Sequence, residues 1–217
     1  MRKITDYFSR KIDTDIPDSH KIDTDIPDVN NIDTLDYKLH IQIIPTFIET
    51  HSLYDHLMSE MGFDITKQRR QKKIYGCIKH YCITYRGQKI QTPVIHWNTI
   101  PVIRNMAEHI SLHYTHMPIH TVTVHFYPNG NIGIKPHRDK EMLSNSIIAS
   151  VSLGATRVMR FERNKGDHVH DFALTDGSLC LIMPPTNDVW LHSIPLDASC
   201  KKSRMSIIFR NYPETEC

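Results

Sequence analysis

The hydrophobic pattern changes character along the chain. In residues 40–61 and 98–114 the apolar side chains recur at helical spacing: Phe47, Tyr54, Leu57, Met58 and Met61 in the first segment, and Val102, Ile103, Met106 and Ile110 in the second. Asn98 or Thr99 is expected to cap the second helix, with Pro101 in its first turn. The sequence therefore predicts two amphipathic helices.

Beyond Met117 the apolar residues come in short β-branched runs. The runs are TVTVHFY, SIIASVSLG, VMRFER, DFALTDG, SLCLIMP and SRMSIIFR, with the turn segments PNGN, RNKGD and PPTND between them. Strands at this spacing are typical of an antiparallel sandwich or barrel. We expect an α+β fold in which the two helices pack on one side of that barrel, with any chemistry in its mouth.

Residues 11–40 repeat with a period of ten, as KIDTDIPDSH, KIDTDIPDVN and the decayed NIDTLDYKLH. These Asp-rich units have too little apolar surface to offset the entropy lost on ordering. We expect residues 11–36 to form a disordered acidic linker and residues 37–217 to form one catalytic domain. A short solenoid is the alternative, but two well-kept copies are fewer than stacking requires.

Charge is unevenly distributed. The net charge is +2, and since residues 1–36 carry nine acidic and five basic side chains, +6 remains on residues 37–217. A mildly basic domain suits a polyanionic partner. Five cysteines in no regular framework, no apolar run of membrane-spanning length and an N-terminus without an apolar signal core predict an intracellular protein with no membrane segment.

A candidate metal site begins with His137 and Asp139, which follow a predicted strand and flank Arg138. Alternate residues of an extended segment point to the same side, so both can reach one ion. His192 lies 53 residues after Asp139, beyond the strand SLCLIMP, and in a barrel two such strand ends can meet. Two imidazoles and one carboxylate are the ligand set of non-haem Fe(II) oxygenases. Taken alone, His137 fits an ordinary surface histidine better than a metal ligand.

Arg204 and Arg210 lie six residues apart on the last predicted strand, and hence on one face. A guanidinium buried inside a barrel is costly unless it meets a carboxylate, and a dicarboxylate cosubstrate supplies one to each. The alternative for Arg204 is a structural ion pair.

From Lys67 to Lys89 the chain carries eight Lys or Arg and no acid, and Tyr75, Tyr81 and Tyr85 are interleaved with them. Positive charges follow phosphates, and aromatic rings stack on an extruded base, so this run predicts a nucleic-acid interface that includes Arg69 and Arg70. An exposed basic hairpin is the alternative reading.

Residues 120–211 resemble the catalytic double-stranded β-helix, or jelly roll, of the AlkB family, and in particular its eukaryotic DNA-repair members. The stretches HFYPNGNIGIKPHRDKE, SIIASVSLGATRVMRFER, PTNDVWLHSIP and SRMSIIFRNY follow in the family's order. The resemblance implies flanking helices and a nucleotide-recognition hairpin. It also implies an Fe(II)- and 2-oxoglutarate-dependent dioxygenase that uses O2 to dealkylate bases such as 1-methyladenine and 3-methylcytosine, releasing formaldehyde and succinate.

Carried over position by position, the resemblance assigns roles to individual residues. His137, Asp139 and His192 would bind iron; Tyr127 and Arg204 would hold the distal carboxylate of 2-oxoglutarate and Arg210 would contact its other end; Tyr85 would sandwich the flipped base, Glu141 would read it, and Tyr75 with Gly76 matches the family's Tyr-Gly. His125 and Ser206 stand at cosubstrate-contacting positions where the family usually has Asn.

The resemblance also sets the expected partner, an alkylated nucleic acid, with DNA favoured over RNA and the enzyme acting as a monomer. A related oxygenase acting on methylated RNA or protein is one alternative, and a catalytically inactive nucleic-acid adaptor is another. The intact set of His137, Asp139, His192, Arg204 and Arg210 argues against the adaptor.

At the N-terminus, Ile4, Tyr7 and Phe8 fall at i, i+3 and i+4, so one helical turn would gather them on one face. Residues 1–10 resemble a PCNA-interacting box in which Met1 replaces the usual Gln. This predicts binding to a PCNA-type sliding clamp and a location in the nucleus or at sites of DNA replication. The alternative is a frayed terminus that carries two aromatic residues by chance.

Overall fold

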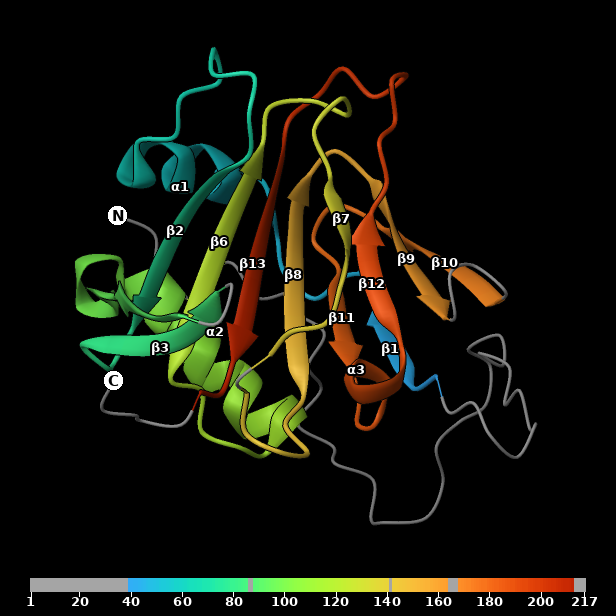
Figure 1. The fold of residues 1–217 in the computed structure, drawn as a ribbon. Coiled ribbons are helices and arrows are strands. Elements are labelled where there is room, and N and C mark those ends of the chain that lie inside the picture. The colour runs from blue at the N-terminus through green and yellow to red at the C-terminus, as the bar shows by residue number, and fades with distance from the viewer. Residues whose placement is uncertain (1–38, 86–87, 141, 164–167, 213–217) are drawn as a thin grey trace, which may run out of the picture.

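The computed structural model describes residues 39–85, 88–140, 142–163 and 168–212 (Figure 1). The predicted clamp motif at 1–10 and the acidic repeats at 11–36 lie outside these ranges. Among the helices described, none is both long and apolar enough to cross a membrane.

Two sheets face each other and a hairpin stands beside them. The larger sheet has the strand order β1 (Ile41–Ile44), β11 (Leu179–Ile182), β8 (Ile148–Gly154), β13 (Arg204–Arg210), β6 (Thr121–Tyr127), β2 (Gln71–Gly76) and β5 (Ile95–His96). The smaller sheet has the order β10 (His168–Leu174), β9 (Arg157–Arg163), β12 (Leu191–Ile194) and β7 (Ile134–His137), and the hairpin pairs β3 (His80–Tyr85) with β4 (Gln88–Pro93).

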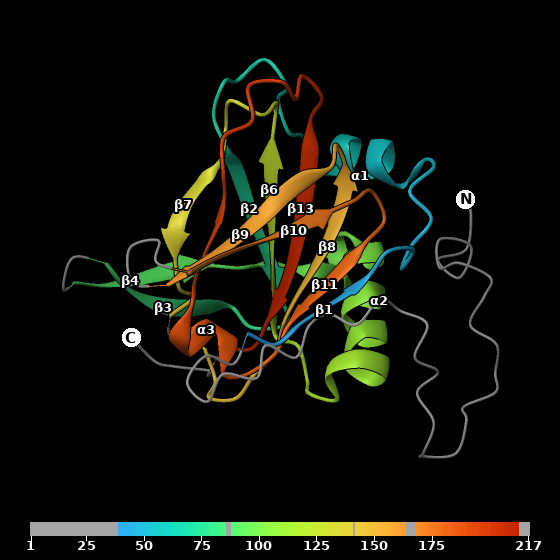
Figure 2. The ribbon, with the colours of Figure 1, turned by 90° about the vertical axis from the view of Figure 1, so that its right-hand side faces the viewer.

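Helices α1 (Leu53–Met61) and α2 (Pro101–Ile110) cover the outer face of the large sheet, and the small sheet covers its inner face (Figure 2). The short helix α3 (Thr186–Val189) connects β11 to β12. This arrangement is the predicted α+β jelly roll with helices packed on one side, and the fold prediction is confirmed.

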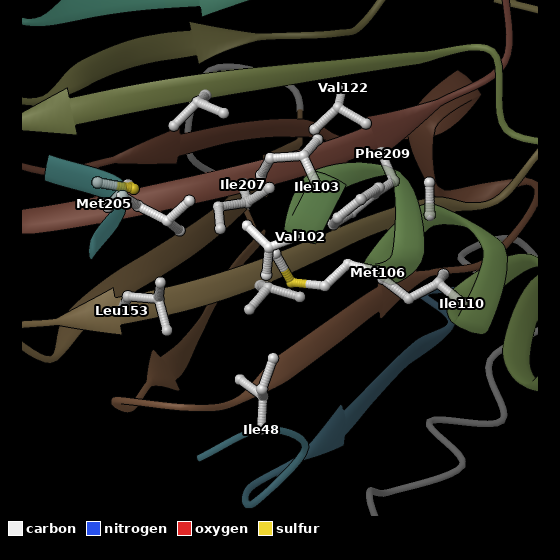
Figure 3. Packing of buried hydrophobic residues seen from close by; sticks show 14 of the residues in the cluster. Ile48, Val102, Ile103, Met106, Ile110, Val122, Leu153, Met205, Ile207 and Phe209 are labelled. Atoms are coloured by element: carbon white, nitrogen blue, oxygen red, sulfur yellow. The ribbon is translucent and has the colours of Figure 1, made fainter. Parts of the chain in front are cut away.

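Strand β13 shows why part of the barrel interior is polar. Met205, Ile207 and Phe209 are buried against α2 in the main core, as Figure 3 shows. Because side chains alternate along a strand, Arg204, Ser206 and Arg210 face the opposite way, toward the small sheet. The neighbouring strands follow the same rule: β6 directs Val122, Val124 and Phe126 to the core, and β8 directs Ala149, Val151 and Leu153 there.

The structure corrects two expectations about the helices. The first helix begins at Leu53, and the apolar residues before it include strand β1, so Phe47 lies outside the helix although its side chain joins the same core. The second helix begins at Pro101 as expected, but neither Asn98 nor Thr99 caps it, because both lie in a preceding 3-10 turn, Trp97–Thr99. In both cases burial against the sheet decided the boundary over local signals.

Candidate metal and cosubstrate site

The three predicted metal ligands meet at one end of the barrel. His137 is the last residue of β7, and it lies directly opposite His192 of β12 in the antiparallel register. The two imidazole rings are 4.3 Å apart between centroids, and Nε2 of His137 is 3.7 Å from Oδ1 of Asp139. One potential ligand atom from each of the three residues lies within 4.8 Å of the others. This spacing allows all three to contact one ion.

Charges around these residues give the protonation states that a metal requires. Burial would raise the pKa of Asp139, but Arg210, whose Nε lies 2.9 Å from Oδ2, together with His192 and His137, lowers that pKa on balance. Burial lowers the pKa of His192 to about 4. At neutral pH the site therefore holds an ionised carboxylate and an uncharged His192, which can donate a lone pair.

His137 is oriented by a hydrogen bond from Nδ1 to the backbone carbonyl of Lys135, at 2.9 Å. Since a carbonyl only accepts, Nδ1 carries the hydrogen and Nε2 keeps its lone pair, directed toward Asp139. Two imidazoles and one carboxylate with this chemistry fit a divalent iron ion and leave coordination positions open for other ligands.

Arg204 lies deeper in the barrel and is 1% exposed. Its Nη2 donates to Oγ of Ser152 at 2.9 Å and its Cζ lies 5.6 Å from the ring centre of Tyr127, while Nε and Nη1 have no hydrogen-bond partner in the described part of the chain. Burial lowers the pKa of Arg204 to about 10, which leaves it charged at neutral pH. A buried cation with two unused donors fits a carboxylate ligand.

The inward-facing residues between the two arginines include polar residues on β6, β8 and β13, with the apolar Ile208 among them. His125 lies opposite Ser206, whose hydroxyl is 3.2 Å from that of Ser150. Burial, followed by the positive charges of Arg70 and Arg210, lowers the pKa of His125 well below its ordinary value. The pocket thus presents neutral hydrogen-bonding groups between two charged ends.

Arg210 differs from its predicted role in its immediate contacts. Its guanidinium pairs with Asp139 and donates from Nη1 to the hydroxyl of Tyr212 at 3.0 Å. Burial alone would lower the pKa of Arg210, but the Asp139 carboxylate together with Tyr212 and Tyr81 raises it on balance. In this structure Arg210 supports a candidate metal ligand, and a contact with 2-oxoglutarate stays a prediction.

The predicted substrate residues have mixed placements. Arg69 is exposed, and Arg70 is half-buried with one buried nitrogen, Nη1, that has no hydrogen-bond partner in the described residues. Tyr85 ends strand β3, and Glu141 lies outside the described residues. Tyr75 is not brought to the site, because its side chain is 2% exposed in the core beneath the helices, where burial raises its pKa to about 12.

Three residues that the sequence did not single out also belong to the site. Ser152 binds Arg204, Tyr212 binds Arg210, and the side-chain amide of Asn187 binds the main chain of Asp139. Ser152 has a sequence signal, since it lies two residues from Ser150 on a strand and so shares its inward face. Asn187 has no such signal, because its partner lies 48 residues away.

Comparison with known proteins defines the class first. Residues 35–210 match the model of the 2OG-Fe(II) oxygenase superfamily, and the chain belongs to that superfamily. Its members use Fe(II), 2-oxoglutarate and O2, so the predicted cofactor and cosubstrates are confirmed for the family. The structure of OsALKBH1 superposes with a TM-score of 0.54 at 12% identity, over 81% of this chain and 99% of that one, and shows the same fold.

Within the superfamily the chain is similar to AlkB-type proteins. It is 35% identical over 121 residues to the DNA oxidative demethylase ALKBH2 of Bos taurus, covering 51% of this chain and 43% of that one. For the human protein of the same name the identity is 34%, over 51% of this chain and 46% of that one. The human alkB homolog 3 is 27% identical over 70% of this chain and 55% of its own length. The chain spans about half the length of these curated relatives.

We predict that His137→Ala, Asp139→Ala and His192→Ala each abolish turnover, because loss of one of three protein ligands severely weakens such a site. Removal of iron by a chelator should abolish turnover of the unaltered protein reversibly. Formaldehyde release measures turnover, and calorimetry with Co(II) measures metal binding by each variant. If Asp139→Ala keeps more than about a tenth of the activity, the ligand assignment is wrong.

Arg204→Ala should raise the 2-oxoglutarate concentration needed for half-maximal turnover by about tenfold to a thousandfold, since a buried charged hydrogen-bond pair contributes a few kcal/mol. Succinate production against 2-oxoglutarate concentration measures it. Arg160→Ala is the matched control, because Arg160 pairs with Asp171 on the exposed surface. An unchanged requirement in Arg204→Ala would show that Arg204 only stabilises the fold.

Proposed function

We propose that this protein oxidatively dealkylates N-alkylated bases such as 1-methyladenine and 3-methylcytosine in nucleic acid, with DNA favoured over RNA as the substrate, releasing formaldehyde and succinate. One observation carries the proposal: the barrel holds both a cluster of His137, Asp139 and His192 and a buried arginine, Arg204, that has no acidic partner in the described residues. The similarity to the DNA oxidative demethylases ALKBH2 supports the choice of substrate class.

His137, Asp139 and His192 would hold Fe(II), which together with 2-oxoglutarate and O2 supplies the oxidation of the alkyl carbon. Arg204, with Ser152 and Tyr127 beside it, would bind the distal carboxylate of 2-oxoglutarate. Neutral His125 and Ser206 would line the carbon chain, and Arg210 would fix Asp139 while lying near the other end of the cosubstrate. The role of these residues is positioning, in a pocket that excludes bulk water.

The nucleic-acid interface would start where β2 enters the large sheet. Partial desolvation, followed by the charges of Arg210 and Arg70, lowers the pKa of Lys72, although much of its side chain is exposed. The positive charges of Arg70 and Lys72 both act on His125, so the two side chains lie at the edge of the candidate active site. With exposed Arg69 they would bind backbone phosphates next to the damaged base. Tyr85 would stack on that base, and Glu141 would recognise it.

The decisive experiment measures formaldehyde release from methylated oligonucleotides in parallel: single- and double-stranded, DNA and RNA, carrying 1-methyladenine or 3-methylcytosine. We expect release from DNA with either lesion and none from any substrate with His137→Ala. Release from methylated RNA or a methylated protein alone would favour the related oxygenase instead. Binding of nucleic acid with no release from any substrate, at full iron and 2-oxoglutarate loading, would favour the inactive adaptor.

Tyr85→Ala should weaken dealkylation by about one to three kcal/mol of lost base stacking, while consumption of 2-oxoglutarate without substrate stays mostly intact. Parallel assays of formaldehyde and succinate separate the two. Tyr75→Phe is a matched control, because Tyr75 lies in the core and should tolerate loss of its hydroxyl. Equal loss of both activities in Tyr85→Ala would mean that the substitution damages the fold.

The motif at residues 1–10 is proposed to tether the enzyme to a sliding clamp, which would place it in the nucleus or at replication sites. The predicted linker at 11–36 would let a monomeric catalytic domain reach DNA around the clamp. By calorimetry, a peptide of residues 1–14 should bind a eukaryotic-type clamp with micromolar-range affinity, and Tyr7→Ala with Phe8→Ala should abolish binding. A peptide that shows no binding at high micromolar concentration removes this proposal and leaves the catalytic one.

A further inference from the structure

We propose that Asn187 is a positioning residue for the metal site, which holds the main chain of Asp139 so that its carboxylate points at the ion. The inference rests on the assignment of His137, Asp139 and His192 as metal ligands. It concerns a residue that is not itself one of the three candidate ligands.

Asp139 lies where the backbone has lost its sheet partner. The β7–β12 register ends at the pair His137 and His192, and in the described residues between His137 and Ile148 the chain has no helix or strand. A main chain there needs other hydrogen bonds to keep one conformation. Asn187 provides a hydrogen bond to each polar group of the Asp139 main chain: its Oδ1 accepts from the Asp139 amide at 3.0 Å, and its Nδ2 donates to the Asp139 carbonyl at 2.8 Å. One side-chain amide thus replaces a neighbouring strand.

Helix α3, which contains Asn187, is itself held in place by hydrogen bonds. Thr186, next to it on α3, is fully buried, and its hydroxyl accepts from the backbone amide of His40 at 2.8 Å. The amide of buried Trp190 closes the helix by donating to the Thr186 carbonyl at 2.8 Å. His192 follows two residues later, so the same connection positions one ligand directly and a second one through Asn187.

A third hydrogen bond joins the same two segments. Nη2 of Arg138, the residue before Asp139, donates to the carbonyl of Val189 at the end of α3, at 2.8 Å. Together with the two bonds of Asn187, it makes three hydrogen bonds between α3 and the two residues Arg138 and Asp139. Figure 2 shows α3 at the end of the barrel toward which β7 runs.

Packing gives the ligand-bearing segment little support on this side. A cavity of about 370 Å³ adjoins Asp139, and its lining includes Arg138, Met142, Asn187 and Asp188. Side chains across an open cavity cannot fix a backbone by contact, so the hydrogen bonds of Asn187 carry that task. With the main chain held by Asn187 and Oδ2 held by Arg210 at 2.9 Å, the Asp139 carboxylate has one preferred direction.

The test is Co(II) binding to the metal-free, full-length protein, measured by calorimetry without cosubstrate. Asn187→Ala should weaken Co(II) binding by about tenfold to a hundredfold, the usual effect of losing a group that orients a metal ligand. It should also change the visible absorption of the Co(II) protein. The matched control is Asp188→Ala, since Asp188 lies next to Asn187, is exposed and lines the same cavity. Its affinity and spectrum should equal those of the unaltered protein.

Thermal unfolding of the metal-free variants separates positioning from general stability. If Asn187→Ala lowers the melting temperature but leaves Co(II) affinity and spectrum unchanged, Asn187 is merely structural and the proposal is wrong. If Asn187→Ala does not fold, Asn187→Leu, which keeps a similar shape without hydrogen bonds, is measured instead with the same expected weakening. Asp139→Ala tests the ligand assignment separately from the role of Asn187, because unchanged Co(II) binding in that variant would refute the ligand assignment itself.

Discussion

Strand β13 must keep two arginines inside the protein while Met205, Ile207 and Phe209 between them pack into an apolar core. Hydrogen bonding to β6 on one side and β8 on the other holds the strand in a single register. A slip by one residue would exchange the two faces, placing Arg204 and Arg210 against α2 and Phe209 inside the barrel. An unpaired buried cation costs several kcal/mol, so such a slip is strongly disfavoured. The pocket depends on this register.

The positive charges of Arg204 and Arg210 are compensated in different ways, so the two ends of the pocket differ. Arg210 has a permanent counter-ion in Asp139. Arg204 has a serine hydroxyl and an aromatic ring beside it, so part of its desolvation cost is left for a ligand to offset. A dicarboxylate that reaches Arg204 therefore stabilises the folded protein as it binds. The neutral His125 between the two ends avoids adding a third buried charge.

The candidate metal site is assembled from segments that meet only because the small sheet closes over the large one. His137 and His192 are neighbours through β7 and β12, whereas Asp139 lies beyond the sheet and depends on side chains from elsewhere. Arg210 reaches its carboxylate from the large sheet, and Asn187 reaches its main chain from α3. A ligand outside regular structure can thus be held by hydrogen bonds from both sides.

The sequence by itself determined the elements whose signals are local. Short β-branched runs bounded by turn residues identified β6, β8 and β13, and the six-residue spacing of Arg204 and Arg210 put them on one face. The spacing of His137 and Asp139 with a later His192 indicated the metal site. Tertiary structure alone decided which face of β2 is buried, and so removed Tyr75 from the predicted interface. It also decided the start of α1 and the contact between Asn187 and Asp139. The physical reason is that burial and hydrogen bonding across 48 residues depend on where other segments pack, which no local pattern records.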